Sequence, residues 1–476
     1  MNVGQGPAVA LALCLSTGCA RTVASPSAGS GTGADGWTYE VRLEEQATVL
    51  SVEASFPAGT DPELAVDDEA DAFLRDVEVA HGAGWERAGE AAGKWIVPPC
   101  RSTGCRLRYR FLLAQAATSL ADADLAGGHR GAFIAPPSTW LLRPLSGPAD
   151  RAFTFRVSRP PDVAFATGVF PWPDSVDTYG AAIGFLSAAP YTAFGRWRLS
   201  RKAAPNATLE IGVAPGTFEA GEGAVSEWIA SAVDVVSRYY GRFPVTRALL
   251  LVVPSGGSGF GYGKTLGNGG ASIVVPIGEK TTRAALADDW VLVHEMIHLA
   301  FPDLPRDKLW LSEGLATYVE PLARARTRRL SAEAVWSGLV HGLPHGLPAE
   351  GDQGLDRTHT WGRTYWGGAL FCFLADMQIR TRTANRRSLD DALRAILEQG
   401  GDATTRWEIG RVLEVGDRAT GVPVLSELYA KMSTTPYPVD LGHLFAELGV
   451  TAAGKGVKFD DSAPLASIRR AMTNPG

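Results

Sequence analysis

The segment His294-Glu295-Met296-Ile297-His298 has the clearest chemical meaning in the chain. On an α-helix, residues four apart lie on one face, so both imidazoles can bind a single ion. Zinc in such a site lowers the pKa of a bound water towards ~7, and Glu295 is placed to accept that proton as general base. Histidines can instead be buried against backbone carbonyls. Two histidines and a glutamate in an apolar helix are costly to bury without a common partner, so the pattern favours zinc-assisted hydrolysis.

A catalytic zinc needs a third protein ligand, and Glu313 is the first candidate. Fourteen residues (299–312) separate it from His298, and a helix, a short turn and an antiparallel helix would bring the carboxylate beside the imidazoles. Glu320, two turns further and just before Pro321, is the second candidate. Glu320 can instead be a solvated helix charge, and Glu313 can be an N-terminal helix carboxylate that the helix dipole favours. We expect one Zn²⁺ per chain, bound by His294, His298 and Glu313.

The flanking sequence predicts the elements that hold these residues. Apolar residues recur at helical spacing over 222–240, and apolar strands are expected at 248–253 and 271–276. The glycine-rich segment 255–270 lacks the phosphate-loop pattern and fits a connection beside an edge strand. A buried helix begins at Asp288 or Asp289 and ends before Pro302, and Asp307 is the expected N-cap of the following helix. We assign residues 216–385 to a catalytic domain.

The zinc motif followed by Trp310-Leu311-Ser312-Glu313-Gly314 resembles the gluzincin arrangement of zinc metallopeptidases of the aminopeptidase N and glycyl aminopeptidase types. The resemblance implies a thermolysin-like catalytic domain. It also implies that His294, His298 and Glu313 are the zinc ligands and that Glu295 is the base. The segment Tyr365-Trp366-Gly367-Gly368 is similar to one in which the family's tyrosine donates a hydrogen bond to the developing oxyanion. Tyr365 is therefore the candidate electrophilic helper, although a packing role is the competing interpretation.

The chain departs from this family at the strand that binds the free amino group of an aminopeptidase substrate. The family's Gly-x-Met-Glu-Asn motif is absent, and Leu266-Gly267-Asn268-Gly269-Gly270 stands in its expected place. The predicted function is peptide hydrolysis by metal-activated water, with exopeptidase or endopeptidase action left open and a peptide or protein as substrate. The alternative is a non-catalytic, peptidase-like surface lipoprotein that serves as a binding or assembly module. The presence of Glu295 beside all three candidate ligands favours the enzyme.

The rest of the chain predicts an α+β protein. Residues 37–215 alternate apolar and polar positions between Gly- and Pro-rich stretches, which indicates an antiparallel β-sandwich-like domain. Residues 386–476 form a C-terminal helical region, in which Ser388 caps a helix that ends at Gly400-Gly401. Cys100 and Cys105 bracket a turn and are a candidate disulfide, whereas Cys372 lies in an apolar run and reads as a buried thiol.

The N-terminus predicts export. Residues 1–19 contain a short apolar run followed by small residues and Cys19, which indicates a signal peptide and makes Cys19 a lipidation candidate. Residues 20–36 are rich in Ser, Gly, Ala and Thr and predict a flexible tether. We expect the protein in the bacterial periplasm, or attached to a membrane only by a lipid anchor at its N-terminus. A net charge of −6 and the lack of a long basic run give no reason to expect a nucleic-acid partner.

Overall fold

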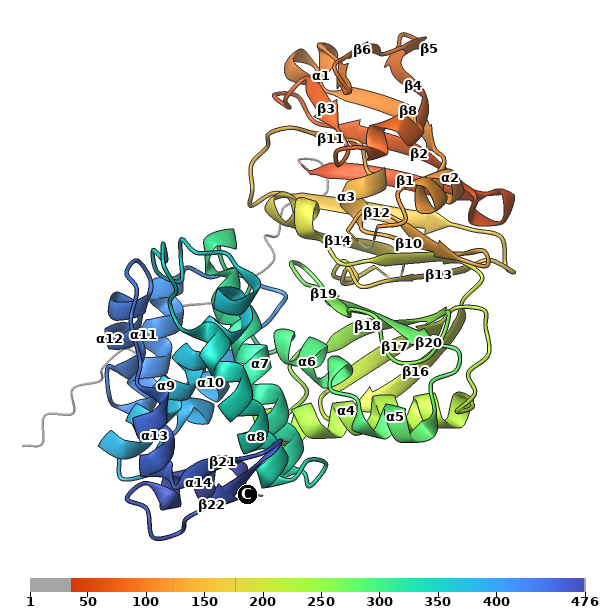
Figure 1. Cartoon of the computed structure of the whole chain (residues 1–476). Helices are drawn as coiled ribbons and strands as arrows, with labels where there is room; N and C mark the ends of the chain where they lie inside the picture. The colour runs from red at the N-terminus through yellow and green to blue at the C-terminus, as the bar shows by residue number, and fades with distance from the viewer. Residues whose placement is uncertain (1–35, 123, 176, 475–476) are drawn as a thin grey trace, which may run out of the picture.

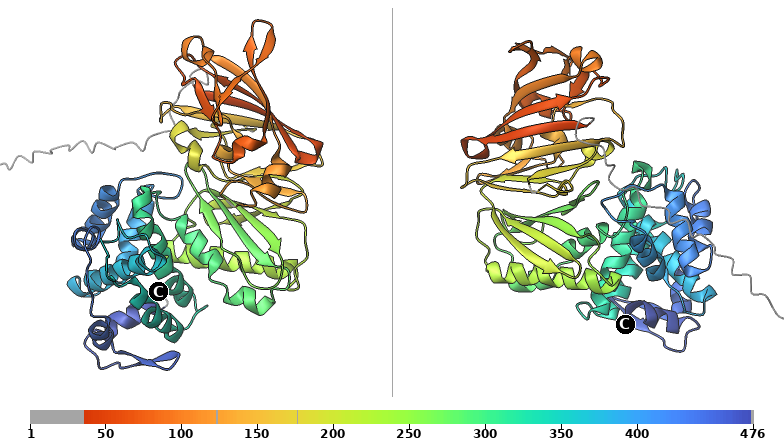
Figure 2. Two further views of the ribbon diagram at one scale, coloured as in Figure 1. Left: turned by 45° about the horizontal axis from the view of Figure 1, so that its top comes forward. Right: turned by 180° about the vertical axis from the view of Figure 1, so that it is seen from behind.

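The computed structural model describes residues 36–122, 124–175 and 177–474. The predicted signal peptide 1–19, its Cys19 and the tether up to residue 35 lie outside the described residues. The described chain forms a β-rich N-terminal domain, a five-stranded sheet with helices on one face, and a helical lobe beside that sheet (Figures 1 and 2). It is thus a mixed α+β protein with several sheets and a C-terminal helical region, as the sequence predicts.

The N-terminal domain is built around a seven-stranded sheet in the order β14-β12-β1-β2-β8-β4-β5. Neighbouring strands in this sheet are antiparallel, except that β1 and β12 pair in parallel. The expectation of a wholly antiparallel sheet is corrected here, because periodicity reveals a strand but not the direction of its partner. The strands are β1 Trp37–Glu44, β2 Val49–Phe56, β4 Leu74–His81, β5 Gly84–Arg87, β8 Cys105–Phe111, β12 Ala152–Ser158 and β14 Thr178–Ala182.

Two four-stranded sheets, three short α-helices and three 3₁₀ helices complete this domain. One sheet has the order β13-β15-β10-β9 and the other β11-β3-β7-β6. Cys100 and Cys105 form the predicted disulfide, with their Cα atoms 4.6 Å apart. The elements are β3 Glu63–Ala65, β6 Gly89–Ala91, β7 Lys94–Ile96, β9 Gly127–His129, β10 Ala132–Ala135, β11 Arg143–Pro144, β13 Ala164–Thr167, β15 Thr192–Gly195, α1 Pro99–Ser102, α2 Leu113–Ser119 and α3 Pro137–Trp140.

A five-stranded sheet in the order β16-β17-β18-β20-β19 carries the next part of the chain. The strands β17, β18 and β20 are parallel, and the two edge strands run antiparallel to their neighbours. The predicted boundary at residue 215 follows β16 and β17, whereas their pairing places both in this second sheet. Its strands are β16 Arg198–Ala204, β17 Ala207–Val213, β18 Arg247–Ser255, β19 Lys264–Leu266 and β20 Ser272–Gly278.

The central strand β18 is buried on both faces, which explains its continuous apolar sequence. Leu250 and Val252 pack in the core that contains helix α4 (Glu222–Tyr240). Leu249 and Leu251 face the opposite way and pack with residues of β10, β13 and β15. The N-terminal domain therefore covers one face of the five-stranded sheet, and α4 lies along the other (Figure 1).

The remaining chain is mainly helical and shares one apolar core with the sheet and α4. This cluster of buried residues extends from β17 to the last helix, so it crosses the predicted boundary at residue 385. The hairpin β21–β22 (Val450–Ala453 and Gly456–Phe459) interrupts the predicted C-terminal helical region. The helices are α5 Arg283–Asp288, α6 Val291–His298, α7 Leu309–Arg326, α8 Ala332–Gly342, α9 Gly368–Arg382, α10 Leu389–Glu398, α11 Ile409–Thr420, α12 Val424–Met432, α13 Leu441–Leu448 and α14 Ala466–Thr473.

No helix in the described part of the chain is both long and apolar enough to cross a membrane.

Candidate metal centre and cleft

Helix α6 carries the two histidines, and its start is fixed by Asp289. The Asp289 carboxylate accepts hydrogen bonds from the backbone N–H groups of Val291 (2.9 Å) and Leu292 (3.1 Å). It also accepts one from the indole of Trp228 on α4, at 2.8 Å. These bonds satisfy orphan donors of the first turn and tie α6 to α4. The helix is buried, and His294 and Glu295 are among its buried residues.

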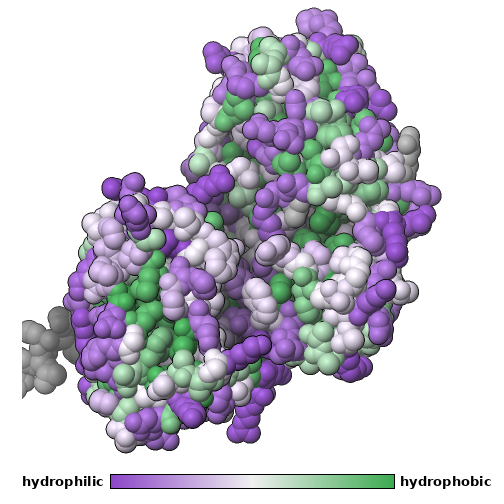
Figure 3. All heavy atoms as spheres, in the orientation of Figure 1, coloured by the Kyte–Doolittle hydropathy of each residue, from purple (hydrophilic) through white to green (hydrophobic). Residues whose placement is uncertain are grey.

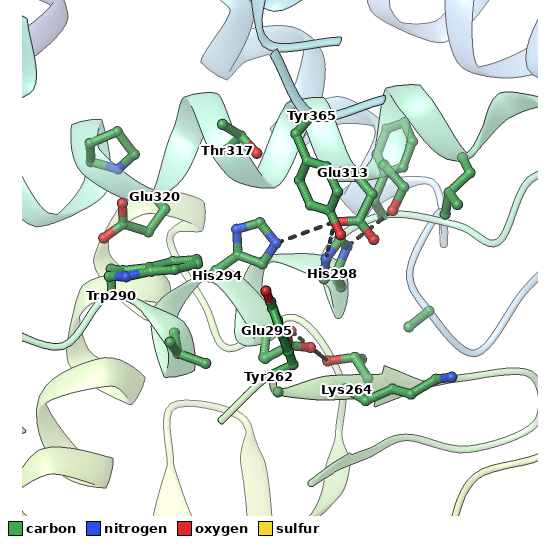
Figure 4. Close-up of a pocket in the computed structure, with 18 of the residues that line it drawn as sticks. Tyr262, Lys264, Trp290, His294, Glu295, His298, Glu313, Thr317, Glu320 and Tyr365 are labelled. Atoms are coloured by element: carbon green, nitrogen blue, oxygen red, sulfur yellow. Dashed lines mark hydrogen bonds and ion pairs between the residues drawn. The ribbon is translucent and has the colours of Figure 1, made fainter. Parts of the chain in front are cut away.

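The structure brings the three predicted ligands together. The Glu313 Oε2 atom lies 3.4 Å from His294 Nε2 and 3.6 Å from His298 Nε2. Candidate ligand atoms of all three residues lie within 4.8 Å of one another. His294 and His298 project from successive turns of α6, and Glu313 reaches them from α7 (Figure 4). Asp307, the predicted N-cap of α7, instead lies in a short 3₁₀ turn over Arg306–Lys308 that precedes the helix.

Hydrogen bonds and charges orient this cluster. His298 Nδ1 lies 3.0 Å from the Ser312 hydroxyl, which leaves Nε2 directed at Glu313. Burial lowers the pKa of His298, but the charge and hydrogen bond of Glu313 and the charge of Glu295 outweigh it, so the pKa is raised. Burial raises the pKa of Glu313, but the two histidines outweigh it and hold the pKa well below its usual value. The carboxylate is therefore ionised at neutral pH.

The Glu295 carboxylate contacts the edge strand β19. The Thr265 hydroxyl lies 2.7 Å from Glu295 Oε2 and 3.0 Å from the Glu295 backbone oxygen, and it donates over the shorter distance to the carboxylate. Gly263, just before the strand, passes so close that a Cβ there would lie 2.5 Å from Glu295 Cγ. The glycine-rich segment thus forms the wall that holds the carboxylate, a role that its composition did not reveal.

Tyr365 enters the cleft from a π-helix over Gly362–Gly367, immediately before α9. Figure 4 shows its ring directed towards Glu313, on the side of the imidazoles opposite α6. Burial, followed by the charges of Glu313 and Glu295, raises the pKa of Tyr365 to about 12, so its hydroxyl remains a hydrogen-bond donor. A second tyrosine, Tyr262, projects into the cleft from the other wall, beneath His294 in this view. Sequence reasoning missed Tyr262, because nothing local distinguishes it from a loop tyrosine.

Close helix packing sets the position of Tyr365 relative to Glu313. A Cβ on Gly314 would lie 2.2 Å from the Cα of Gly368, so α7 and the start of α9 touch through their backbones. Glu313 precedes one of these glycines, and Tyr365 lies three residues before the other. The two glycines were visible in the sequence, but their mutual contact was not.

Glu320, the second candidate ligand, is outside the cluster of metal-ligating atoms. It is buried further along α7 and accepts a hydrogen bond from Arg324 Nη1 at 3.0 Å. Burial raises the pKa of Glu320 to about 7 against the opposing charge of Arg324, with Asp289 and Asp288 adding to the rise. Glu320 is better described as the buried partner of Arg324 than as a third ligand.

The cluster opens into a cleft of about 1390 Å³. Its walls are formed by the segment 260–268, α6, α7, α8 and the π-helix. The surface is hollowed where the helical lobe meets the β-rich part of the molecule (Figure 3). The cleft therefore presents two imidazoles, the carboxylates of Glu295 and Glu313, and two tyrosine hydroxyls to one open space. This set is suited to metal-assisted attack of water on a carbonyl.

Comparison with known proteins identifies the fold. No protein-family model matches the sequence, and no curated protein matches it significantly. An aminopeptidase N family protein from Idiomarina loihiensis superposes with a TM-score of 0.66 at 13% identity, covering 87% of this chain and 78% of that one. The M1 zinc metallopeptidase from Deinococcus radiodurans superposes with a TM-score of 0.53 at 16% identity, covering 85% and 96%. A mutant of the Deinococcus enzyme bound to a Tyr-Ser-Ala substrate gives 0.55 at 15% identity, covering 85% and 95%. The chain has the gluzincin aminopeptidase-like fold that its motifs predict.

Proposed function

We propose that the protein is a zinc-dependent metallopeptidase. The observation that carries this proposal is the meeting of His294, His298 and Glu313 around one point, with Glu295 beside it in an open cleft. The structural neighbours include M1 zinc metallopeptidases, which supports the same class of chemistry.

The three side chains fit a zinc ion. Zinc–nitrogen and zinc–oxygen bonds of about 2.0–2.2 Å at tetrahedral angles place ligand atoms roughly 3.3–3.5 Å apart. The distances from Glu313 Oε2 to the two Nε2 atoms are 3.4 and 3.6 Å. The Ser312 hydroxyl contacts the second ring nitrogen of His298 and orients the imidazole. Metal-bound imidazoles commonly have a hydrogen-bond partner of this kind. Two imidazoles and one carboxylate are also the ligand set of catalytic zinc sites that keep a fourth position open.

The chain's own residues account for the proton transfers of peptide hydrolysis. A bound zinc would polarise the peptide carbonyl and lower the pKa of water in the site. Glu295 accepts a proton from the attacking water and returns it to the leaving amine. Tyr365 donates a hydrogen bond to the oxyanion that forms on the carbonyl. Thr265 holds the Glu295 carboxylate in place during both transfers.

Metal analysis combined with peptide cleavage tests this function. Purified wild-type protein, Glu313→Ala and Glu295→Gln are compared by elemental analysis and by cleavage of a mixed peptide library. We expect one zinc per chain in the wild type, loss of zinc in Glu313→Ala, and retained zinc without cleavage in Glu295→Gln. A folded wild-type protein that cannot be loaded with zinc would contradict the proposal and support the non-catalytic binding module.

We also propose that the protein is exported and that Cys19 carries a lipid. The residues before Cys19 and the tether that follows support this. The Cys100–Cys105 disulfide is also typical of an oxidising compartment. Cell fractionation and mass spectrometry of the mature N-terminus, with Cys19→Ser as control, test the proposal. A protein that keeps its first 19 residues and stays in the cytosol would contradict it.

A further inference from the structure

Large apolar side chains that remain exposed gather at the cleft. Among the described residues, six large hydrophobic side chains are exposed, and four of these line the cleft. The four are Tyr262 (98% exposed), Leu309 (50%), Trp290 (52%) and Trp361 (63%). Scattered exposed apolar residues need no explanation, but a group around one concave site marks a surface that a ligand covers.

One arm of the cleft has apolar walls below its rim, interrupted by the buried Glu320. Between α7 and α8 it is lined by Val335 and Leu339, which are buried, and by Pro321. Gly338 lies on the same wall, and a Cβ added there would meet no atom within 4 Å. Gly338 is exposed, so it borders the open side of this arm, which a large side chain at that position would obstruct.

The charged groups that line the cleft are already paired. Among the described lining residues, Glu320 is bonded to Arg324, and Lys264 pairs with Asp124 of the N-terminal domain. Asp303 accepts hydrogen bonds from Asn268 at 3.2 Å and from Arg406 at 2.8 Å. Glu295 and Glu313 belong to the proposed chemistry. None of these carboxylates is left to neutralise the ammonium group of a free peptide N-terminus, whose burial without a partner is costly.

We infer that the cleft selects peptides by a large apolar or aromatic side chain beside the scissile bond, and that it does not require a free amino terminus. This inference rests on the proposed peptidase function. The side chain occupies the arm between α7 and α8, and the aromatic rim covers the neighbouring residues of an extended peptide. Gly338 is a specificity-determining residue, because it sets the room available in that arm.

Matched peptides test the substrate class. Each peptide is prepared with a free and an acetylated N-terminus, and with Phe, Ala or Asp at each position flanking the cleaved bond. At one of these positions, we expect kcat/KM at least tenfold higher for Phe than for Ala, because apolar pockets discriminate on this scale. Acetylation should change kcat/KM by less than about threefold, since no paired charge is lost. A strict need for the free terminus, or equal cleavage of all side chains, would overturn the inference.

Variants of Gly338 locate the pocket. Gly338→Trp should fill the arm, lowering kcat/KM for the Phe peptide at least tenfold while leaving the Ala peptide within about threefold. Gly338→Ala is the matched control and should retain the preference for Phe. For the rim, Tyr262→Ala should raise KM for the Phe peptide several-fold. Leu145→Ala, an exposed apolar residue outside the cleft, should not. An unchanged Phe-to-Ala ratio in Gly338→Trp would contradict the assignment of the pocket.

A binding measurement separates failure of this inference from failure of the proposed function. Fluorescence anisotropy of labelled, acetylated peptides is followed on the Glu295→Gln variant, which needs no turnover. Tighter binding of the Phe than of the Ala peptide, abolished by a second Gly338→Trp substitution, supports the inference even if no bond is cleaved. If the wild type cleaves peptides but neither binding nor cleavage depends on the apolar side chain, the function stands and the inference is wrong.

Discussion

The Glu295 carboxylate receives one side-chain hydrogen bond among the described residues, from Thr265 at 2.7 Å. We predict that Thr265→Val lowers kcat about tenfold, because a base that rotates away from its working position loses part of the benefit of general catalysis. KM and zinc content should stay near wild type, since the substitution removes no candidate ligand and keeps the size of a side chain that lines the cleft. Steady-state kinetics and elemental analysis measure both.

Thr265→Ser is the control, because it keeps the hydroxyl and loses only a methyl group. It should restore most of the lost kcat. Equal losses in the serine and valine variants would show that packing, and not the hydrogen bond, is what matters at this position.

At the residue scale, the sequence predicted the groups that a motif spaces along one helix. His294, Glu295 and His298 are close because the helix makes them so, and Glu313 follows at the next helix. The sequence could not predict that Thr265 and Gly263 contact Glu295. These contacts span about thirty residues and depend on how β19 lies against α6. Tyr262 and Gly338 were missed because only the tertiary structure places them in the lining of the cleft.

Helix α7 approaches the start of α9 through a backbone contact between Gly314 and Gly368. We predict that Gly314→Ala lowers the free energy of unfolding by about 1–3 kcal/mol, because overpacking forces the helices apart. Zinc affinity should fall as well, since Glu313 moves with α7. Denaturant unfolding and competition with a zinc chelator measure the two effects. Gly338→Ala on α8, where the added carbon meets nothing, should stabilise the protein slightly or leave it unchanged.

Glu320 gives α7 a pH-dependent contribution to stability. Its pKa is raised from 4.5 to about 7 on folding, so the stability it provides is complete below about pH 4.5 and lost as pH rises through 7. The change amounts to about 3 kcal/mol, at about 1.4 kcal/mol per pKa unit. Between pH 5 and 8, the free energy of unfolding of wild type should therefore fall more than that of Glu320→Gln. Urea unfolding at both pH values measures this, with the exposed Glu333→Gln as control.

At the element scale, long periodic segments were predictable and special turns were not. The helix expected over 222–240 is α4 with the same bounds, and Gly241, which caps its C-terminus, has a left-handed conformation. Ser388 and Asp391 form the capping box at the start of α10. The π-helix over Gly362–Gly367 and the parallel pairing of β1 with β12 carry no periodic signature, since both depend on the surroundings of the segment.

The whole molecule is held together by an apolar core between its N-terminal domain and the five-stranded sheet. Ile134 and Tyr191 on one side pack with Leu249 and Leu251 on the other, and the Tyr191 backbone N–H donates to the Ser272 hydroxyl at 2.9 Å. We predict that both parts unfold in one transition. Hydrogen exchange in β8 and in α6 should report the same midpoint in denaturant, and Ile134→Asp should lower both midpoints together. Two separate midpoints in the wild type would contradict this.

The shared apolar core also explains why the predicted domain boundaries differ from the boundaries of the sheets and of the core. The change from alternating strands to helices occurs after residue 213, yet β16 and β17 already belong to the second sheet. Similarly, the helices after residue 385, predicted as a C-terminal helical region, bury their apolar faces in the same core as α6 and α7. Periodicity reports which face of an element is buried, but not which neighbour buries it.

The π-helix that carries Tyr365 has a consequence for how related chains can diverge. A π-turn holds one residue more than an α-turn, so removing a single residue after Tyr365 would restore α-helical geometry. The tyrosine would then turn by about 100° relative to α9, away from the cleft. His294, His298 and Glu313 would be untouched, because they lie on other helices. A single-codon deletion could thus separate the proposed oxyanion donor from the proposed metal site in one evolutionary step, and its reversal could restore the arrangement.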